Sequence, residues 1–356
     1  MPLEHLIDTF GDDMVLLMAG LSVGLVFGVA AQRSAFCLRA STVEVSQGVL
    51  GPRMSVWLVA FFAALATTQG AILFGALDVS QARPLSGVGS LSGAIIGGML
   101  FGIGMVLARG CASRLLVLSA TGNLRALITG LVLTVVAQSS LRGILAPSRE
   151  YLSQLWVISG DGRDLGYVLS LSTAVVTWGA VAALVVSIGL ARYRKLAWTK
   201  IFAAACVGGA VTLGWWATYA LSQVSFEVVD VSSVTFTGPA TDTLMAFVAE
   251  RSVPLSFGLG LVPGVFLGAG GAAILFREWH IERFSSDTPM ERYLVGAVLM
   301  GFGAMLAGGC AVGAAMSGGA IMAVTAWVAA LSIWGGGVAT SLVLTYLETV
   351  RRPSVA

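Results

Sequence analysis

Three of the four cysteines in this chain follow a glycine by nine residues, in closely similar apolar surroundings. The pairs are Gly28 and Cys37, Gly102 and Cys111, and Gly301 and Cys310. A thiol can act as a nucleophile, a metal ligand or a weak hydrogen-bond donor. A single buried cysteine usually serves only as a small hydrophobe, and we interpret Cys206, inside an alanine-rich run, in that way. The shared context of the other three predicts one common functional role.

The spacing of these thiols also limits their chemistry. The sequence contains no CxxC pair and no histidine cluster, which argues against a disulfide framework and against a zinc site. We therefore expect no metal, no cofactor and no catalytic cycle of disulfide formation.

The second and third cysteine segments can be superimposed at a constant offset of 199 residues. Residues 102–112 match residues 301–311, and both segments begin with Gly-x-Gly and end with Gly-Cys-Ala. A shorter echo relates residues 24–29 to residues 260–265, where Ala273 takes the position of Cys37. Internal repeats in a membrane chain are typical of transporters whose site lies where the repeats meet.

The elements that must position these cysteines are membrane helices. Apolar residues make up 57% of the chain and charged residues only 11%, which leaves too little charge for the surface of a soluble domain. Charge-free runs long enough to cross a bilayer recur along the sequence, and residues 293–347 hold two of them. We predict an all-α integral membrane protein of about nine spans, with short re-entrant or half helices.

The direction of these spans follows from the basic residues. With the amino terminus outside, most of the 20 basic residues fall on the inner side, including the group Arg192, Arg194, Lys195 and Lys200. The same count makes the spans of Cys111 and Cys310 antiparallel, as an inverted repeat requires. The spans that begin at Gly24 and Gly260 run the same way, so either a half-helix turns back or this echo is only a packing pattern.

Glycines next to the cysteines predict breaks in these helices. Gly110 and Gly309 directly precede Cys111 and Cys310, and only a short apolar segment follows each cysteine before the next glycine turn. Broken backbone at membrane depth occurs where it is buried in protein or lines a cavity. The free amides at the start of a half-helix suit an anion.

Arginines cluster within four residues of two of the cysteines. These residues are Arg33, Arg39, Arg109 and Arg114. Charges beside broken membrane helices are usually functional, although snorkelling to the surface is the alternative. Gly308 replaces Arg109 in the second copy, so two symmetric arginine clamps are not expected. We interpret Glu44, Glu278 and Glu282 as surface ion-pair partners rather than proton carriers, and His280 as an interfacial rather than a catalytic residue.

Three motifs, in this order and with these separations, resemble the YeeE/YedE family of bacterial sulfur-compound transporters. They are QRSAFC (residues 32–37), GIGMVLARGC (residues 102–111) and GAMLAGGC (residues 303–310). The resemblance runs from about residue 14 to residue 347. It implies a nine-span inner-membrane protein that takes up thiosulfate, with Cys37, Cys111 and Cys310 along the pathway. It also implies that a small sulfur carrier of the TusA type, here a separate chain, can be a partner.

The residues and the resemblance together predict one membrane transport domain, residues 1–356. Its repeat halves span roughly 14–146 and 254–347, joined by spans in residues 165–226. The expected substrate is thiosulfate or a related sulfur anion, and lipid surrounds the chain, which is not expected to bind nucleic acid. The site residues are Cys37, Cys111 and Cys310, supported by Arg33, Arg39, Arg109, Gly110 and Gly309. Alternatives are transport of a selenium or other sulfur species, a membrane thiol redox or sulfur-transfer enzyme, and a binding subunit.

Overall fold

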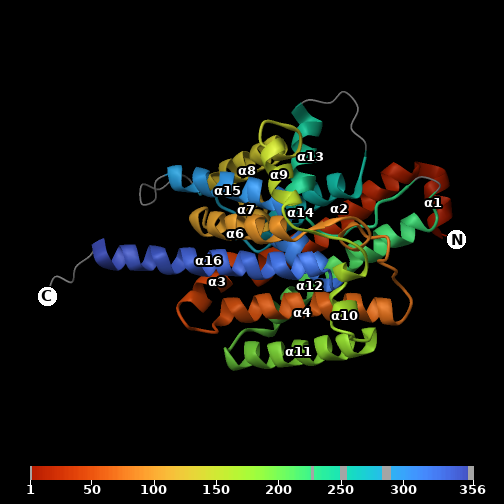
Figure 1. Ribbon diagram of the computed structural model, residues 1–356, viewed down its shortest axis with the longest axis horizontal. Coiled ribbons are helices and arrows are strands. Elements are labelled where there is room, and N and C mark those ends of the chain that lie inside the picture. Colours follow the sequence, from red (N-terminus) through yellow and green to blue (C-terminus); the bar gives the residue numbers. More distant parts are fainter. Residues whose placement is uncertain (1, 226–227, 249–254, 283–289, 352–356) are drawn as a thin grey trace.

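Long apolar runs separated by short polar turns fold into a bundle of helices that share one long direction (Figure 1). The computed structural model describes residues 2–225, 228–248, 255–282 and 290–351. The long helices are α2 (Asp12–Ser34), α4 (Pro52–Leu73), α6 (Leu91–Leu107), α8 (Leu124–Arg142), α11 (Thr173–Tyr193), α12 (Trp198–Ser222), α14 (Phe257–Leu275), α15 (Met290–Leu306) and α16 (Val324–Arg351).

Shorter elements connect these helices. They are α1 (Pro2–Phe10), α3 (Leu38–Ser46), α5 (Arg83–Ser86), α7 (Ala112–Ala120), α9 (Ala146–Gln154), η1 (Gly160–Arg163), α10 (Leu165–Val168), α13 (Thr237–Val248) and the π-helix η2 (Ala311–Gly318). Strands β1 (Gly89–Ser90) and β2 (Val157–Ile158) pair antiparallel, with Gly89 opposite Ile158.

Within the described residues, nine segments are long and apolar enough to cross a membrane. This confirms the predicted all-α, nine-span membrane fold. Three of the nine are composite, because α2 continues into α3, α6 into α7, and α15 into η2. Each composite span carries one of the three predicted cysteines at its break.

Helices α6 and α15 form an antiparallel pair in which each helix is the repeat of the other. Both have 17 residues and the offset between them is 199 along their whole length. A Cβ atom at Gly97 would lie 2.6 Å from the carbonyl oxygen of Gly303, and one at Gly104 would lie 2.5 Å from that of Gly296. The two backbones therefore touch, which only glycine permits. This geometry is that of the predicted inverted repeat.

Helices α2 and α14 also pack backbone to backbone, but they run parallel. Cβ atoms at Gly20, Gly24 and Gly28 would overlap the backbone of α14, and those at Gly260, Gly264 and Gly268 would overlap the backbone of α2. In this packing Gly20 lies level with Gly260, whereas the sequence echo aligns Gly24 with Gly260. The packing register therefore differs from the register of the echo by about one helical turn. The shared direction agrees with the predicted one, and the glycine spacing serves packing here.

The core of the bundle includes the buried cysteines. Cys111 and Cys310 belong to one continuous cluster of buried side chains that also contains Phe27, Phe101 and Met300. Side chains of α11, by contrast, point largely outward, and Trp178 is 68% exposed. An apolar outer face is expected for helices that contact lipid.

Candidate functional site

The three predicted cysteines share one backbone motif. Cys37, Cys111 and Cys310 occupy the N-cap positions of α3, α7 and η2, and each has an extended backbone. Two residues before each cysteine the chain has a positive φ: 53° at Ala35, 55° at Arg109 and 79° at Gly308. The reversed residue ends the preceding helix and lets a new one begin at the thiol. Each thiol thus lies at an amide-rich helix start.

The first two thiols meet in space. Cys37 and Cys111 lie close enough for their side chains to interact, although they are far apart in sequence. The Cys111 sulfur also lies 3.4 Å from the Ser113 hydroxyl. Cys111 is buried and Cys37 is partly exposed, so this pair joins the protein core to an open cavity.

The third thiol is held separately. Cys310 is 1% exposed, and its sulfur accepts a hydrogen bond from the backbone N–H of Gly313 at 3.5 Å. Its half-helix contacts α7, which places the two repeat-related half-helices next to each other. The described residues do not bring Cys206 to these thiols; it packs at the edge of the main core, in agreement with its interpretation as a packing residue.

Cys37 opens onto a basic cavity of about 420 Å³. Its lining consists of Ala35, Cys37, Arg39, Ala40, Val43, Arg53, Arg109, Arg114 and Leu118. Four of these nine residues are arginines and none is acidic. Four gathered guanidinium groups attract anions strongly and repel cations. We call this space the arginine cavity.

Two arginines of the arginine cavity have unpaired buried nitrogens. The Nε atom of Arg39 and an Nη atom of Arg114 are buried without a hydrogen-bond acceptor in the described residues. Arg39 also experiences the positive charges of Arg109 and Arg292. Buried polar groups are nearly always hydrogen-bonded, and leaving a donor unpaired costs about 1–3 kcal/mol. A bound anion would supply the missing acceptors and the missing negative charge.

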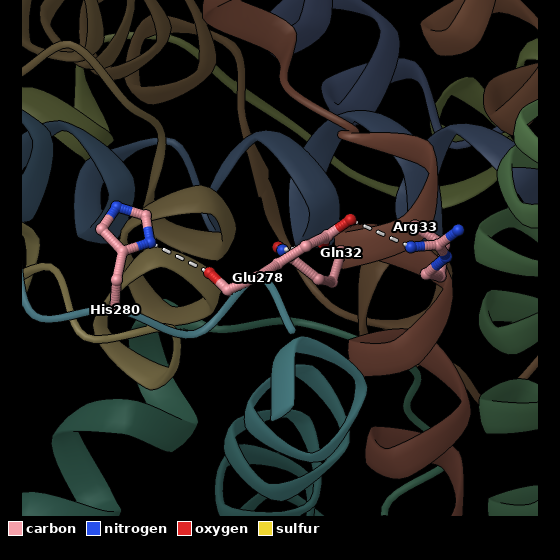
Figure 2. A network of polar contacts seen from close by, with 4 residues as sticks. All are labelled: Gln32, Arg33, Glu278 and His280. Atoms are coloured by element: carbon pink, nitrogen blue, oxygen red, sulfur yellow. Dashed lines mark hydrogen bonds and ion pairs between the residues drawn. The ribbon is translucent and has the colours of Figure 1, made fainter. Parts of the chain in front are cut away.

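Arg33 has a different environment from the other predicted arginines. It forms an ion pair with Glu278 at 3.1 Å, and its guanidinium lies 3.7 Å from the centre of the Phe276 ring. Gln32 and His280 contact Glu278 as well (Figure 2). The Gln32 side-chain amide donates a hydrogen bond to the Glu278 carboxylate, and a ring nitrogen of His280 contacts the backbone carbonyl oxygen of Glu278. This network ties the end of α2 to the segment after α14, outside the lining of the arginine cavity.

The two predicted glycines, Gly110 and Gly309, allow close packing at the helix breaks. Gly110 directly precedes Cys111, beside Leu115, and a Cβ at Gly309 would lie 2.9 Å from the Ala314 nitrogen. Among the acidic residues, Glu278 is the ion-pair partner that was predicted, whereas Glu44 accepts hydrogen bonds from the amides of Arg53 and Met54 and so caps α4. Glu282 accepts from the Asn123 side chain.

Sequence reasoning missed Arg53. It follows the turn between α3 and α4, and that hairpin folds it back onto the cavity beside Cys37. No local motif marks it, because its role depends on the position of the whole hairpin. Among the described residues, no group of three His, Cys, Asp or Glu side chains could hold a metal ion.

Comparison with known proteins connects this arrangement to transport. Residues 33–339 match the model of a family described as sulphur transport. The chain belongs to this sulphur transport family. The match includes all three predicted pathway cysteines and, in full, seven of the nine spans found among the described residues, which makes this a multi-pass membrane protein of a transporter family.

Two relatives that are similar to this chain carry the same name. Thiosulfate transporter TsuA of Escherichia coli (strain K12) is 27% identical over 371 residues, covering 96% of this chain and 98% of that protein. Thiosulfate transporter TsuA of Spirochaeta thermophila is 28% identical over 334 residues, covering 89% of this chain and 95% of that protein. The similarity is distant but extends over nearly the whole length.

Proposed function

We propose that this chain carries thiosulfate, or a closely related sulfur-containing anion, inward across the bacterial inner membrane, along a path past Cys37, Cys111 and Cys310. The observation that carries the proposal is the arginine cavity, where four arginines without a carboxylate surround a thiol and two buried guanidinium nitrogens lack acceptors. The names of the two relatives support the choice of thiosulfate among sulfur anions.

The chemistry of thiosulfate matches both parts of the site. Its two negative charges suit the guanidinium groups, and its soft terminal sulfur suits a thiol, which is only a weak hydrogen-bond donor. Weak contacts at successive thiols hold the ion without trapping it, as conduction through several sites requires.

The orientation is part of the proposal. The amino terminus lies outside the cell and the carboxyl terminus inside. The basic turn between α11 and α12, with Arg192, Arg194 and Lys195, supports this direction. The arginine cavity, at the α3–α4 end of the bundle, is then the cytoplasmic mouth, and the ion passes Cys310 first. A separate TusA-like carrier that receives the ion there stays a prediction, as does a selenium compound as substrate.

Uptake of radiolabelled thiosulfate into vesicles tests the proposal. We expect a thiol-blocking reagent to stop uptake and a large excess of sulfate to compete poorly, because sulfate has the charge but lacks the terminal sulfur. Cys310→Ser should transport far less than its similar size suggests, since a hydroxyl is harder and more strongly hydrated. Equal competition by sulfate, together with full activity of Cys310→Ser, would leave a generic anion pathway.

The meeting of Cys37 and Cys111 favours one second candidate, a membrane enzyme that exchanges electrons or sulfur through this thiol pair. Such an enzyme would form a disulfide or persulfide between turnovers. Trapping the thiols with an alkylating reagent during uptake, followed by mass spectrometry of both peptides, separates the two functions. Transport with both thiols continuously reduced excludes the enzyme.

A further inference from the structure

The helical segment that follows Cys310, which comprises η2 and the two helical residues after it (residues 311–320), is one residue longer than its repeat partner α7 (residues 112–120). Up to the cysteines the offset is 199, since α6 begins at Leu91 and α15 at Met290. Beyond the half-helices it is 200, since α8 begins at Leu124 and α16 at Val324. The copy that contains Cys310 has therefore gained one residue within 311–323.

Backbone features at the end of each half-helix give the same count. Gly122 and Met322 have positive φ angles of 100° and 59°. One residue later, Asn123 and Ala323 each form an isolated β-bridge with a distant segment, to Glu282 and Asp164. Both pairs of positions differ by 200, so the extra residue lies between Cys310 and this turn.

The extra residue is absorbed as a π-helix. Residues 112–120 form a regular α-helix, whereas Ala311–Gly318 form the π-helix η2. A π-helix makes i to i+5 hydrogen bonds and is rare; it occurs mostly as short insertions at functional sites. The two repeats therefore hold the same half-helix in two forms within one structure.

Buried side chains from two other helices hold η2 and the residues after it. Trp215 on α12 donates its indole N–H to the carbonyl of Ser317 at 3.2 Å. Gln69 on α4 donates to the carbonyl of Ala320 at 2.8 Å. Both side chains are at least 95% buried. The Ser317 hydroxyl donates to the carbonyl of Val234 at 2.6 Å, which closes this set of contacts.

The corresponding turn after α7 is held differently. The carbonyls of Thr121 and Gly122 accept hydrogen bonds from the backbone amides of His280 and Glu282. Among the described residues, no side chain on another helix donates a hydrogen bond to a carbonyl of this segment, as Trp215 and Gln69 do in the other repeat. Of the two half-helices, only the one with the extra residue thus receives side-chain donors from other helices within the part of the chain that the structure describes.

We propose that Trp215 and Gln69 are positioning residues that hold the Cys310 half-helix in its π form, and that this half-helix tightens to the α form of α7 when they release it. A one-residue change of register rotates a helical side chain by about 100°. Gly308 and Gly309 allow that rotation at Cys310. Cys310 is buried in the π form, whereas Cys111, whose half-helix has the α form, lies against Cys37 at the arginine cavity. Turning Cys310 toward the pathway in the same way would then be one step of the transport cycle. Only this last role rests on the proposed function.

The rate at which Cys310 is alkylated, measured by mass spectrometry in the otherwise unaltered chain, tests the proposal without any transport assay. Trp215→Phe keeps an aromatic side chain, although a smaller one, and removes the indole N–H donor. We expect about tenfold faster alkylation, the effect of one buried hydrogen bond on a two-state equilibrium. Trp216→Phe, the neighbouring exposed tryptophan, is the matched control and should match the parent chain.

A deletion separates this switch from simple loosening. Ala314 and Ala315 are adjacent, so deleting either gives the same chain and restores the spacing of the first repeat. This variant should be alkylated rapidly at Cys310, and adding Trp215→Phe should change nothing further, because no π form is left to release. Equal acceleration by Trp215→Phe in the deleted chain would overturn the proposal. So would equal rates for Trp215→Phe and Trp216→Phe, an outcome that does not depend on recovering the deletion.

Discussion

The thiols of Cys111 and Cys310 are buried at glycine-supported breaks, and each sits where a helix begins anew. We expect Cys111→Ala and Cys310→Ala each to abolish or sharply reduce thiosulfate uptake while the protein still inserts, because the weak donor along the path is lost. Cys206→Ala should transport normally, with a stability cost of at most about 1 kcal/mol. Vesicle uptake normalised to the amount of inserted protein measures all three, and normal uptake by both pathway variants contradicts a thiol path.

Arg39 differs from an ordinary surface arginine because one of its nitrogens is buried without an acceptor in the cavity. Arg39→Gln should raise the thiosulfate concentration at half-maximal uptake by at least about tenfold, since a charge-assisted contact contributes roughly 1.5–3 kcal/mol. Arg142→Gln, at the exposed end of α8, is the control. Uptake measured as a function of thiosulfate concentration at fixed ionic strength compares the two variants. Identical curves for Arg39→Gln and Arg142→Gln would remove Arg39 from the site.

Residue types could be read from the sequence more completely than residue surroundings. Nine-residue spacing marked the three cysteines, and the arginines near them marked a basic site. Arg33 and Arg39 look equivalent in sequence, yet Arg33 pairs with Glu278 and Arg39 faces the cavity. That difference depends on where the segment after α14 returns, which no local pattern encodes.

Helix packing in this fold depends on glycine because lipid gives little apolar driving force between helices. Gly264→Ala should destabilise the protein by about 1–3 kcal/mol, since its Cβ would overlap the carbonyl oxygen of Leu21. Gly271→Ala, on the same helix, meets nothing within 4 Å and should be neutral or slightly stabilising. Thermal unfolding midpoints in detergent compare the two. A Gly264→Ala protein as stable as Gly271→Ala would show that the α2–α14 contact can adjust.

The elements themselves were largely predictable, since charge-free runs and glycine turns define the spans and their breaks. The π-helix was not, because a one-residue insertion is invisible where the two copies have diverged after Cys310. The register of α2 against α14 also needed the structure, since four-residue glycine spacing fits several registers equally well. The division into repeat halves, residues 14–146 and 254–347, stays a prediction.

The orientation of the whole molecule follows in our proposal from its basic turns. A cysteine at position 195, in a chain without other cysteines, should react with an impermeant reagent only after cells are permeabilised. A cysteine at position 161, exposed in η1 before the start of α11, should react in intact cells and serves as the control. Labelling of position 195 from outside would reverse the direction of the transporter and make the arginine cavity its outer mouth.

The arginine cavity has a consequence for how this protein meets its surroundings. Four clustered guanidinium groups without carboxylates bind anions with little selectivity, as an anion-exchange resin does. In a cell that contains chloride and phosphate, we therefore expect the cavity to hold one of these inorganic anions when no substrate is present. A passing substrate must then exchange with a resident counter-ion instead of filling an empty space. Because charges at an open mouth are screened over about 8 Å at physiological salt, the measured affinity will depend on the buffer anion as well as on the substrate.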